Sequence, residues 1–294
     1  MIYRKKILIL GASGMLGHTV FLKFLDNKKF NTFGSVRNKN FFNLKKINKK
    51  MINLNLKNLR KLEITISKLQ PDFVINCAGV IKQNIDLIEN KDIYLINSVL
   101  PNFISLISNK YNFKFIQIST DCVFDGKKGK YTEKDKRNAK DIYGLSKKIG
   151  EIDSENCITI RTSIIGHELN SSKSLLEWFL SQSSEISGYK KAFFSGLTTT
   201  EISRILEKTI SKKNISGIFN LSSKRISKYH LLLKLNNIYN KGIKILPSNK
   251  LAIDRSLNGN KFKKEFRIKV NSWEQMIKDM KNFYIKNKII YEKF

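Results

Sequence analysis

The stretch Lys6–Leu25, which reads KILILGASGMLGHTVFLKFL, decides the fold of this chain. We predict a strand at Lys6–Leu10, because its uninterrupted apolar run suits a parallel strand that is buried on both faces. Three glycines follow within Gly11–Gly17, and His18–Leu25 has the apolar spacing of a helix. A strand, three glycines at this spacing and a helix make up the arrangement that binds the pyrophosphate of a dinucleotide.

Each glycine of this loop has its own task in that interpretation. Gly11 makes the tight turn, Gly14 lets the backbone approach a pyrophosphate, and Gly17 lets the helix pack against the strand. The phosphates then lie at the helix N-terminus. The residues predicted to line this part of a cofactor site are Gly11, Ser13, Gly14, Met15, Leu16 and Gly17. An ordinary strand–helix turn is the alternative interpretation.

The end of the second predicted strand, Phe30–Val36, bears on the choice of cofactor. NAD-specific sites carry an acidic residue near this point, whereas an arginine suits the 2′-phosphate of NADPH. The strand is followed by Arg37, and no Asp or Glu occurs between Asn27 and Arg60. We therefore expect NADPH, with NADH as the alternative if Arg37 is a solvated loop residue.

Strand-like and helical segments alternate over the first half of the chain. Further strands are predicted at Met51–Leu56, Asp72–Asn76, Phe113–Ile118 and Cys157–Thr162, and helices up to Leu69 and over Leu87–Lys110. This alternation predicts an α/β fold, a doubly wound parallel sheet of the Rossmann type, with ligands beyond the carboxyl ends of its strands. Cys77, Ala78 and Gly79 follow one such end, and we expect them to approach the cofactor.

The pattern changes after residue 165. We predict an NAD(P)-binding Rossmann domain over 1–165 and a smaller substrate-binding α/β portion over 166–294, with about 198–221 returning to the Rossmann sheet. The elements expected in this second portion are a less regular stretch at Gly166–Ser195, helices at Thr198–Ile210 and Ser227–Tyr239, strands at Gly217–Leu221 and Ile243–Leu246, a loop at Ile253–Ser256 and a basic helix from Ser272.

A proton-delivery set stands in Ser119–Glu151. Ser119 and Thr120 follow an apolar strand, and Tyr143 precedes Lys147 by four residues, which places both on one face of a helix. A hydroxyl, a tyrosine and a lysine beneath it suit the protonation of a reacting oxygen. A packed tyrosine with a surface lysine is the structural alternative.

Composition narrows the choice of partners. The formal net charge is +31, yet the basic residues are mostly lysine, so we expect an anionic small substrate and no nucleic acid. The three cysteines and three histidines lack metal-ligand spacing, so no metal site is expected. We expect a cytoplasmic protein without membrane attachment, because the sequence contains no window as long as a membrane span.

Four motifs occur in a familiar order: GASGMLG, NCAG at Asn76–Gly79, STDCVFDG at Ser119–Gly126, and YGLSK at Tyr143–Lys147. With them the chain resembles an extended short-chain dehydrogenase/reductase, and most of all the dTDP-4-dehydrorhamnose reductase family. FSGLTTTE at Phe194–Glu201 and IDRSLN at Ile253–Asn258 extend this resemblance towards the C-terminus.

The resemblance implies NADPH-dependent reduction of the 4-keto group of a nucleotide-linked 6-deoxy sugar, in the biosynthesis of surface polysaccharide. Tyr143 would donate the proton, and Lys147 would favour tyrosinate and hold the nicotinamide ribose. The resemblance further implies that Thr120 bonds the substrate oxygen with help from Ser119, that Arg255 contacts the diphosphate, and that Asn97 lies in the cofactor site. Asn53 would lie at the adenine, where related proteins tend to have an aspartate.

Several alternatives stay open. Related 4,6-dehydratases carry a glutamate at the position of Cys122, so its absence favours reduction without elimination. Cys122 also departs from the tyrosine common in the rhamnose reductases, which points to a UDP-2-acetamido-6-deoxy-4-hexulose reductase as one alternative. An epimerase and a non-catalytic regulatory subunit, such as the methionine adenosyltransferase partner of this fold, are the others. A homodimer is left open. Arg161 and Arg225 are weaker candidates for substrate contact.

Overall fold

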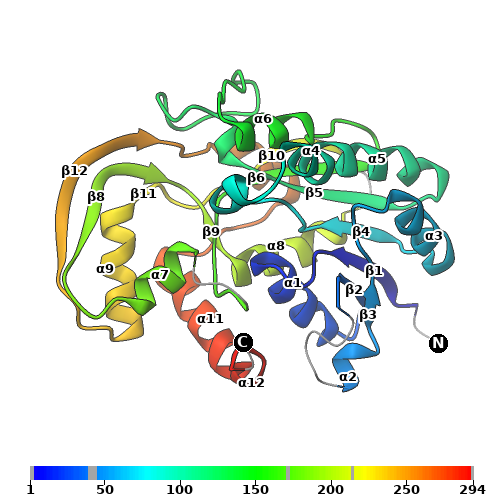
Figure 1. Ribbon diagram of the computed structural model, residues 1–294, viewed down its shortest axis with the longest axis horizontal. Coiled ribbons are helices and arrows are strands. Elements are labelled where there is room, and N and C mark those ends of the chain that lie inside the picture. The colour runs from blue at the N-terminus through cyan, green and yellow to red at the C-terminus, as the bar shows by residue number, and fades with distance from the viewer. Residues whose placement is uncertain (1–2, 39–44, 170–172, 213–214, 293–294) are drawn as a thin grey trace. The chain divides into compact units, whose positions relative to one another are not determined.

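The computed structural model of the protein (Figure 1) describes residues 3–38, 45–169, 173–212 and 215–292. The chain forms two compact units. The first comprises Met1–Thr120, Lys140–Ile160 and Thr209–Phe219, and the second comprises Asp121–Ala139, Arg161–Lys208 and Asn220–Phe294. Each unit therefore collects three separate stretches of chain.

A seven-stranded sheet with the order β10-β6-β5-β4-β1-β2-β3 organises the first unit. Its central pairings, from β5 through β4, β1 and β2 to β3, are parallel, which confirms the doubly wound Rossmann-type fold. The strands are β1 (Lys5–Leu10), β2 (Phe30–Val36), β3 (Met51–Asn53), β4 (Phe73–Asn76), β5 (Lys114–Thr120), β6 (Cys157–Thr162) and β10 (Gly217–Asn220). The edge strand β10 is the late segment that was expected to return to the sheet.

The helices of this unit are α1 (Met15–Leu25), α2 (Lys45–Asn48), α3 (Leu59–Leu69), α4 (Asn90–Tyr94), α5 (Leu100–Lys110) and α6 (Ile142–Ile149), with a 3-10 helix, η1, at Lys82–Leu87. Apolar residues of α3 and α5 pack with those of the sheet; the buried set includes Leu62, Ile66, Ile104, Ile107, Leu8, Val74 and Phe115.

The single helix predicted at Leu87–Lys110 is wrong in detail. The structure has α4, then a π-helical turn, η2, at Leu95–Val99, and then α5. Pro101 lies in the first turn of α5, where a missing N–H costs no hydrogen bond. The π-helical turn lies immediately before α5, and in such a turn the backbone hydrogen bonds span five residues instead of four.

A three-stranded sheet with the order β11-β8-β12 organises the second unit. β8 (Ile186–Phe194) pairs parallel with β12 (Ile245–Asp254) and antiparallel with β11 (Ile226–Ser227). Figure 1 shows β8 and β12 running side by side. Two predictions are corrected here. The stretch Gly166–Ser195 contains the long strand β8, and the strand predicted at Ile243–Leu246 is longer, because β12 continues its pairing with β8 past a shift in register between Ser248 and Ala252.

The remaining elements of the second unit include a short pair of parallel strands, β7 (Ile164–Ile165) and β9 (Leu197–Thr198). Its helices are α7 (Leu175–Ser181), α9 (Lys228–Tyr239), α10 (Asn260–Phe266), α11 (Trp273–Lys286) and α12 (Lys288–Tyr291), and a 3-10 turn, η3, lies at Asp121–Val123. The helix α8 (Thr199–Ile210) ends in the first unit.

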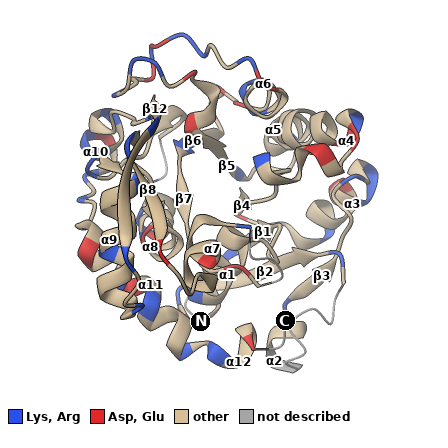
Figure 2. Ribbon diagram, turned by 60° about the vertical axis from the view of Figure 1, so that its left-hand side comes forward, with Lys and Arg blue, Asp and Glu red and all other residues tan. Residues whose placement is uncertain are grey.

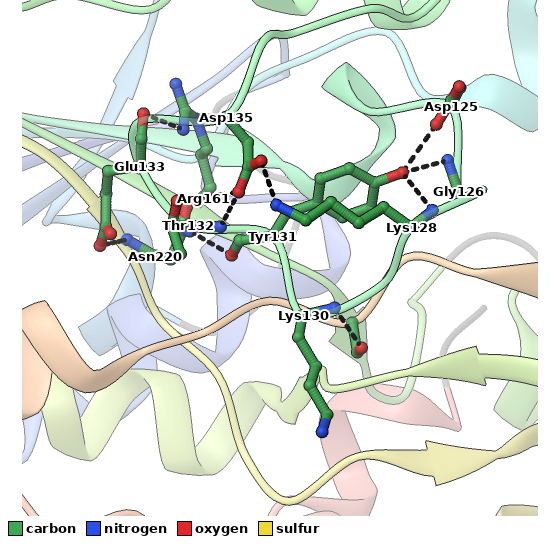
Figure 3. A network of polar contacts seen from close by, with 11 residues as sticks. Asp125, Gly126, Lys128, Lys130, Tyr131, Thr132, Glu133, Asp135, Arg161 and Asn220 are labelled. Carbon is green, nitrogen blue, oxygen red and sulfur yellow. Dashed lines mark hydrogen bonds and ion pairs between the residues drawn. The ribbon is translucent and has the colours of Figure 1, made fainter.

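The segment that follows Thr120 folds with the second unit, and Figure 3 shows how it is held. The Tyr131 hydroxyl accepts the N–H groups of Gly126 and Lys128 at 3.1 and 3.0 Å and donates to Asp125 at 2.7 Å. Asn220 Nδ2 donates to the Tyr131 carbonyl at 2.8 Å. The residues after the predicted catalytic threonine are therefore fixed by hydrogen bonds within the segment and by one from the distant Asn220.

Within the described ranges, none of the helices combines the length and the apolar character needed to cross a membrane. The same residues contain no group of three or more His, Cys, Asp or Glu side chains suited to a metal ion. Basic residues are spread over helices such as α10 and α11, where Figure 2 marks their positions along the ribbon in blue.

Candidate active site

The glycine loop is a tight turn that leaves no room for a side chain at Gly11. Gly11 has φ +74°, and a Cβ placed there would lie 2.9 Å from the Ala78 backbone. Its N–H donates to Ser35 Oγ at 3.1 Å, and the Ala12 N–H donates to the Ser35 carbonyl at 2.9 Å. The loop is thus held between the ends of β2 and β4.

The N-terminus of α1 is built to receive an anion. Its cap is Gly14 in an extended conformation, and within the described structure no side chain caps this helix end and no acidic residue lies in its first turn. The first N–H groups of a helix have no partner within the helix, and they favour negative charge. The residues present therefore fit a dinucleotide pyrophosphate, which they would hold through backbone N–H groups.

Alanine substitutions at two of these glycines are expected to have different effects. A Cβ at Gly17 would lie 2.0 Å from the Gly11 carbonyl oxygen, whereas a Cβ at Gly14 would meet the same oxygen at an ordinary 3.4 Å. We expect Gly17→Ala to lower the free energy of unfolding by about 2 kcal/mol or more, since α1 must move away from the loop. Gly14→Ala should keep its stability and weaken dinucleotide binding. Thermal unfolding and cofactor titration of both variants check this, and equal stability would contradict it.

Asn97 braces the chain behind the second predicted cofactor loop. Its Oδ1 accepts the Val80 N–H at 2.9 Å, and its Nδ2 donates to the Val80 carbonyl at 3.0 Å and to Ser146 Oγ at 3.1 Å. A Cβ at Gly79 would lie 3.2 Å from Asn97 Oδ1 and 3.8 Å from Lys147 Nζ. Asn97, predicted as a cofactor residue, thus ties the Ala78–Gly79 loop to α6, and Gly79 gives close access to Lys147.

Lys147 is buried on α6 at the end of β5. Its Nζ donates to the Ile118 carbonyl at 2.8 Å. Burial lowers the pKa of Lys147 to about 8, while the charge of Glu151 and the nearby Cys77 act in the opposite direction. Burial also raises the pKa of the Cys77 thiol to about 12, so that thiol stays protonated at neutral pH.

The two hydroxyls at the end of β5 differ in their surroundings. Ser119 Oγ donates to Glu151 Oε1 at 2.7 Å, so its proton is engaged within the protein. Thr120 is the last residue of β5 and is 7% exposed. The Ser119 hydroxyl, which was predicted to help bind the substrate, can still accept a hydrogen bond, but its own proton is donated to Glu151.

Tyr143 and Lys147 share the helix α6, which spans Ile142–Ile149. Asp141 begins this helix by accepting the Gly144 N–H at 2.9 Å, and Tyr143 is half-buried. A spacing of four residues puts both side chains on one face of α6. The structure therefore places Thr120, Tyr143 and Lys147 in the first unit, together with the glycine loop.

Arg37 and Asn53, predicted at the adenosine end of the cofactor, lie at neighbouring strand ends. Arg37 follows β2, and Asn53 ends β3 directly opposite Val36 in the parallel register. Both residues are exposed. They lie where a cofactor along the carboxyl edge of the sheet would present its adenosine phosphate.

The predicted substrate arginines belong to the second unit. Arg255 donates through Nε to the Phe124 carbonyl at 3.1 Å and is half-buried. Arg161 is buried near the Phe124 ring, and its Nη1 lies 3.5 Å from the Glu133 carbonyl. Arg225 forms an ion pair with Asp254 at 2.7 Å. Of these three, Arg161 is buried, whereas Arg225 is exposed and holds an ion pair.

Lys228, the first residue of α9, was not singled out from the sequence. Its Nζ lies 4.1 Å from the centroid of the Phe194 ring, and its charge interacts with Asp121 and Cys122. A lysine after a helix cap is an ordinary surface pattern in a sequence. Only the fold brings it to the residues that follow Thr120.

Comparison with known proteins agrees with this geometry. Residues 5–285 match the family model of the RmlD substrate binding domain. The chain is 31% identical over 170 residues to the spore coat polysaccharide biosynthesis protein SpsK of Bacillus subtilis (strain 168), covering 55% of this chain and 54% of that protein. It is 29% identical over 147 residues to the dTDP-4-dehydrorhamnose reductase of Aggregatibacter actinomycetemcomitans, covering 50% and 45%. The matches thus span about half the length of these two relatives.

A longer match, 24% identical over 265 residues, is to the methionine adenosyltransferase 2 subunit beta of Danio rerio, covering 84% of this chain and 76% of that protein. Among solved structures, the dTDP-4-dehydrorhamnose reductase of Bacillus anthracis in complex with NADP superimposes with a TM-score of 0.78 at 19% identity, over 97% of this chain and all of that one. At this identity the superposition shows a common fold.

Proposed function

The chain belongs to the family of the RmlD substrate binding domain, and from this premise we propose that it reduces the 4-keto group of a nucleotide-linked 6-deoxy sugar with NADPH. One observation carries the proposal: Lys147 is buried beside the Gly79 loop and stands on the same face of α6 as Tyr143. The name of the related reductase supports dTDP as the nucleotide. The name of the Bacillus relative supports a role in polysaccharide biosynthesis, which would take place in the cytoplasm.

The first unit supplies the parts of such a reaction. NADPH, when bound, supplies a hydride to the ketone carbon. Tyr143 gives its phenolic proton to the oxygen, so that one hydride and one proton together yield the alcohol. The Lys147 ammonium stabilises the tyrosinate that is left, and Thr120 holds the carbonyl oxygen by a hydrogen bond. The backbone of Gly11–Gly17 would bind the pyrophosphate.

The direct test is NADPH oxidation by the purified protein with dTDP-, UDP- and GDP-linked 4-keto-6-deoxy sugars. We expect turnover with one nucleotide series and none without the keto sugar. A UDP-2-acetamido-6-deoxy-4-hexulose belongs in the panel, because Cys122 departs from the residue that the rhamnose reductases commonly carry. No oxidation with any member would overturn the proposed function.

The long match to a methionine adenosyltransferase subunit favours a second candidate function, a non-catalytic regulatory subunit. In a reductase Tyr143 and Lys147 would be catalytic, whereas in a regulatory subunit they would have no catalytic role. A regulatory subunit would bind dinucleotide without consuming it and would co-elute with a methionine adenosyltransferase in gel filtration. NADPH oxidation with a keto sugar excludes a purely regulatory role.

Cofactor choice yields a separate prediction at Arg37. We expect Arg37→Ala to raise the KM for NADPH about tenfold or more and to leave the KM for NADH within twofold, because a charge-assisted hydrogen bond to a phosphate contributes roughly 1.5–3 kcal/mol. Arg60→Ala, which removes another exposed arginine of the first unit, is the matched control. A wild-type protein that prefers NADH would contradict the assignment.

A further inference from the structure

A pair of amide side chains is buried inside the parallel sheet of the first unit. Asn76 ends β4, Gln117 lies on β5, and the two residues are directly opposite each other in the parallel register. Neither side chain is more than 1% exposed. The other residues of β4 are the apolar Phe73, Val74 and Ile75, as is usual for strands that are covered on both faces. A buried polar group costs stability unless it is hydrogen-bonded, so this pair depends on its partners.

Hydrogen bonds join the amide pair into a chain that runs in one direction. The Ala78 N–H donates to Asn76 Oδ1 at 3.1 Å, and Asn76 Nδ2 donates to Gln117 Oε1 at 2.9 Å. Gln117 Nε2 then donates to the Ile118 carbonyl at 3.3 Å. A backbone N–H only donates and a carbonyl only accepts, so the two ends of the chain fix the orientation of both amides. Hydrogen bonds aligned in this way strengthen one another.

The chain ends on the carbonyl oxygen that also holds Lys147. The buried Lys147 Nζ donates to the Ile118 carbonyl at 2.8 Å, so the ammonium group and the Gln117 amide share one acceptor. Ile118 follows the last residue of β5 that pairs with β4, which is Gln117 itself. The two side-chain donors are thus neighbours over one oxygen, and the place of one limits the place of the other.

The opposite end of the chain lies at the predicted cofactor loop Cys77–Gly79. Ala78 gives its N–H to Asn76, and a Cβ placed at Gly11 would lie 2.9 Å from the Ala78 backbone. Ala78 therefore lies against the turn of the glycine loop. Two amides connect this residue with the acceptor of Lys147, and every member of the chain belongs to the first unit.

We propose that Gln117 is a positioning residue of the reductase, which holds the Lys147 ammonium in a fixed place relative to the cofactor loop. This inference rests on the proposed function and adds a residue through which the site is arranged. Because Gln117 is buried, it acts through Lys147 and not by contact with a ligand. The alternative is a pair of amides that only satisfies backbone groups where the pairing of β4 and β5 ends.

Gln117→Met removes both amide hydrogen bonds and keeps the length of the side chain. We expect kcat for the keto sugar at pH 7 to fall about tenfold, because a small displacement of a positioned group can cost up to about 10² in rate. The dissociation constant for NADPH, measured by calorimetry, should rise about threefold at most, since the affected interaction acts mainly in the transition state. Gln70→Met is the matched control at an exposed position of the same unit and should resemble wild type.

Gln117→Glu supplies a measurement that a purely structural amide would not change. Its carboxylate can still accept the Asn76 hydrogen bond, and it places a negative charge beside Lys147, because both side chains reach the Ile118 carbonyl. A nearby opposite charge favours the charged form of a lysine, so the alkaline fall in kcat/KM should move up by about one pH unit or more. Gln70→Glu adds the same charge at the exposed position and should leave the pH profile unchanged.

The other outcomes overturn the inference. A wild-type pH profile for Gln117→Glu, or a wild-type kcat for Gln117→Met, would leave the amides with a structural role only. An equal loss of kcat and NADPH affinity would make Gln117 a support of the cofactor loop. Thermal unfolding shows whether the variants fold; if Gln117→Glu does not, the comparison of kcat with NADPH affinity in Gln117→Met decides, and if neither folds, the pair is structural. Failure of the proposed function would instead appear in wild type, as no NADPH oxidation with any keto sugar, and the positioning role would fall with it.

Discussion

Tyr143→Phe should reduce kcat for the keto sugar by about a thousandfold and leave cofactor binding unchanged. A positioned general acid contributes roughly 10²–10⁴ in rate, and phenylalanine removes the proton while keeping the ring. The half-buried Tyr143 lies in the first turn of α6, where Asp141 caps the helix independently of the phenol. The expected loss is therefore one of chemistry and not of folding. Single-turnover rates with NADPH, beside NADPH titration, measure the two effects separately.

Tyr111→Phe is the matched control for this substitution. The Tyr111 hydroxyl donates to Glu63 at 3.0 Å in the same unit, and Tyr111 precedes the start of β5, whose other end carries Thr120. We expect its kcat to equal that of wild type, since only a partly exposed hydrogen bond is lost. If Tyr143→Phe retains turnover within a few-fold of this control, then Tyr143 is not the general acid and the site must be assigned anew.

The parts of this site that could be predicted are those with local signals. An apolar run, a glycine triplet and a helical pattern adjoin one another in Lys6–Leu25, and the resulting β1, loop and α1 follow from steric and solvation rules that act over a few residues. The Tyr143 and Lys147 pair is equally local. Such features need no knowledge of where the rest of the chain lies.

The parts that could not be predicted depend on distant partners. Ser119 was expected to help bind the substrate, yet its donor is directed at Glu151, 32 residues away. Asn97 braces Val80 across 17 residues and Ser146 across 49. Tyr131 accepts a hydrogen bond from Asn220, 89 residues later, in the second unit, to which all of the Ser119–Gly126 motif after Thr120 belongs. Hydrogen-bond direction and burial are set by the tertiary fold, and a sequence pattern does not carry them.

The second large effect is expected for substitution of Lys147, whose charge should also set how kcat/KM depends on pH. Lowering the pKa of a tyrosine by roughly three units corresponds to about 4 kcal/mol of stabilisation of the tyrosinate, and the Lys147 ammonium is the charge placed to supply it. Lys147→Met should therefore reduce kcat/KM by about 10²–10³, whereas Lys148→Met, one residue along the same helix, should act as wild type.

Burial lowers the pKa of Lys147 to about 8, so the lysine is charged below that pH and neutral above it. We expect wild-type kcat/KM to fall as the pH rises through about 8.

Glu151 limits how far burial lowers the pKa of Lys147. Its negative charge raises the pKa of Lys147 against the effect of burial, and Ser119 Oγ holds the carboxylate in place at 2.7 Å. Glu151→Gln removes the charge and keeps an oxygen that can accept the Ser119 hydrogen bond, so Lys147 should lose its proton at a lower pH. The fall in kcat/KM should then begin at a lower pH than in wild type, with activity at pH 6 nearly unchanged. Profiles from pH 6 to 10 in Glu151→Gln, Ser119→Ala and wild type test this. A Glu151→Gln profile that coincides with wild type would mean that the fall reports a group other than Lys147, since removing a nearby charge cannot leave the titration of a buried ammonium unmoved.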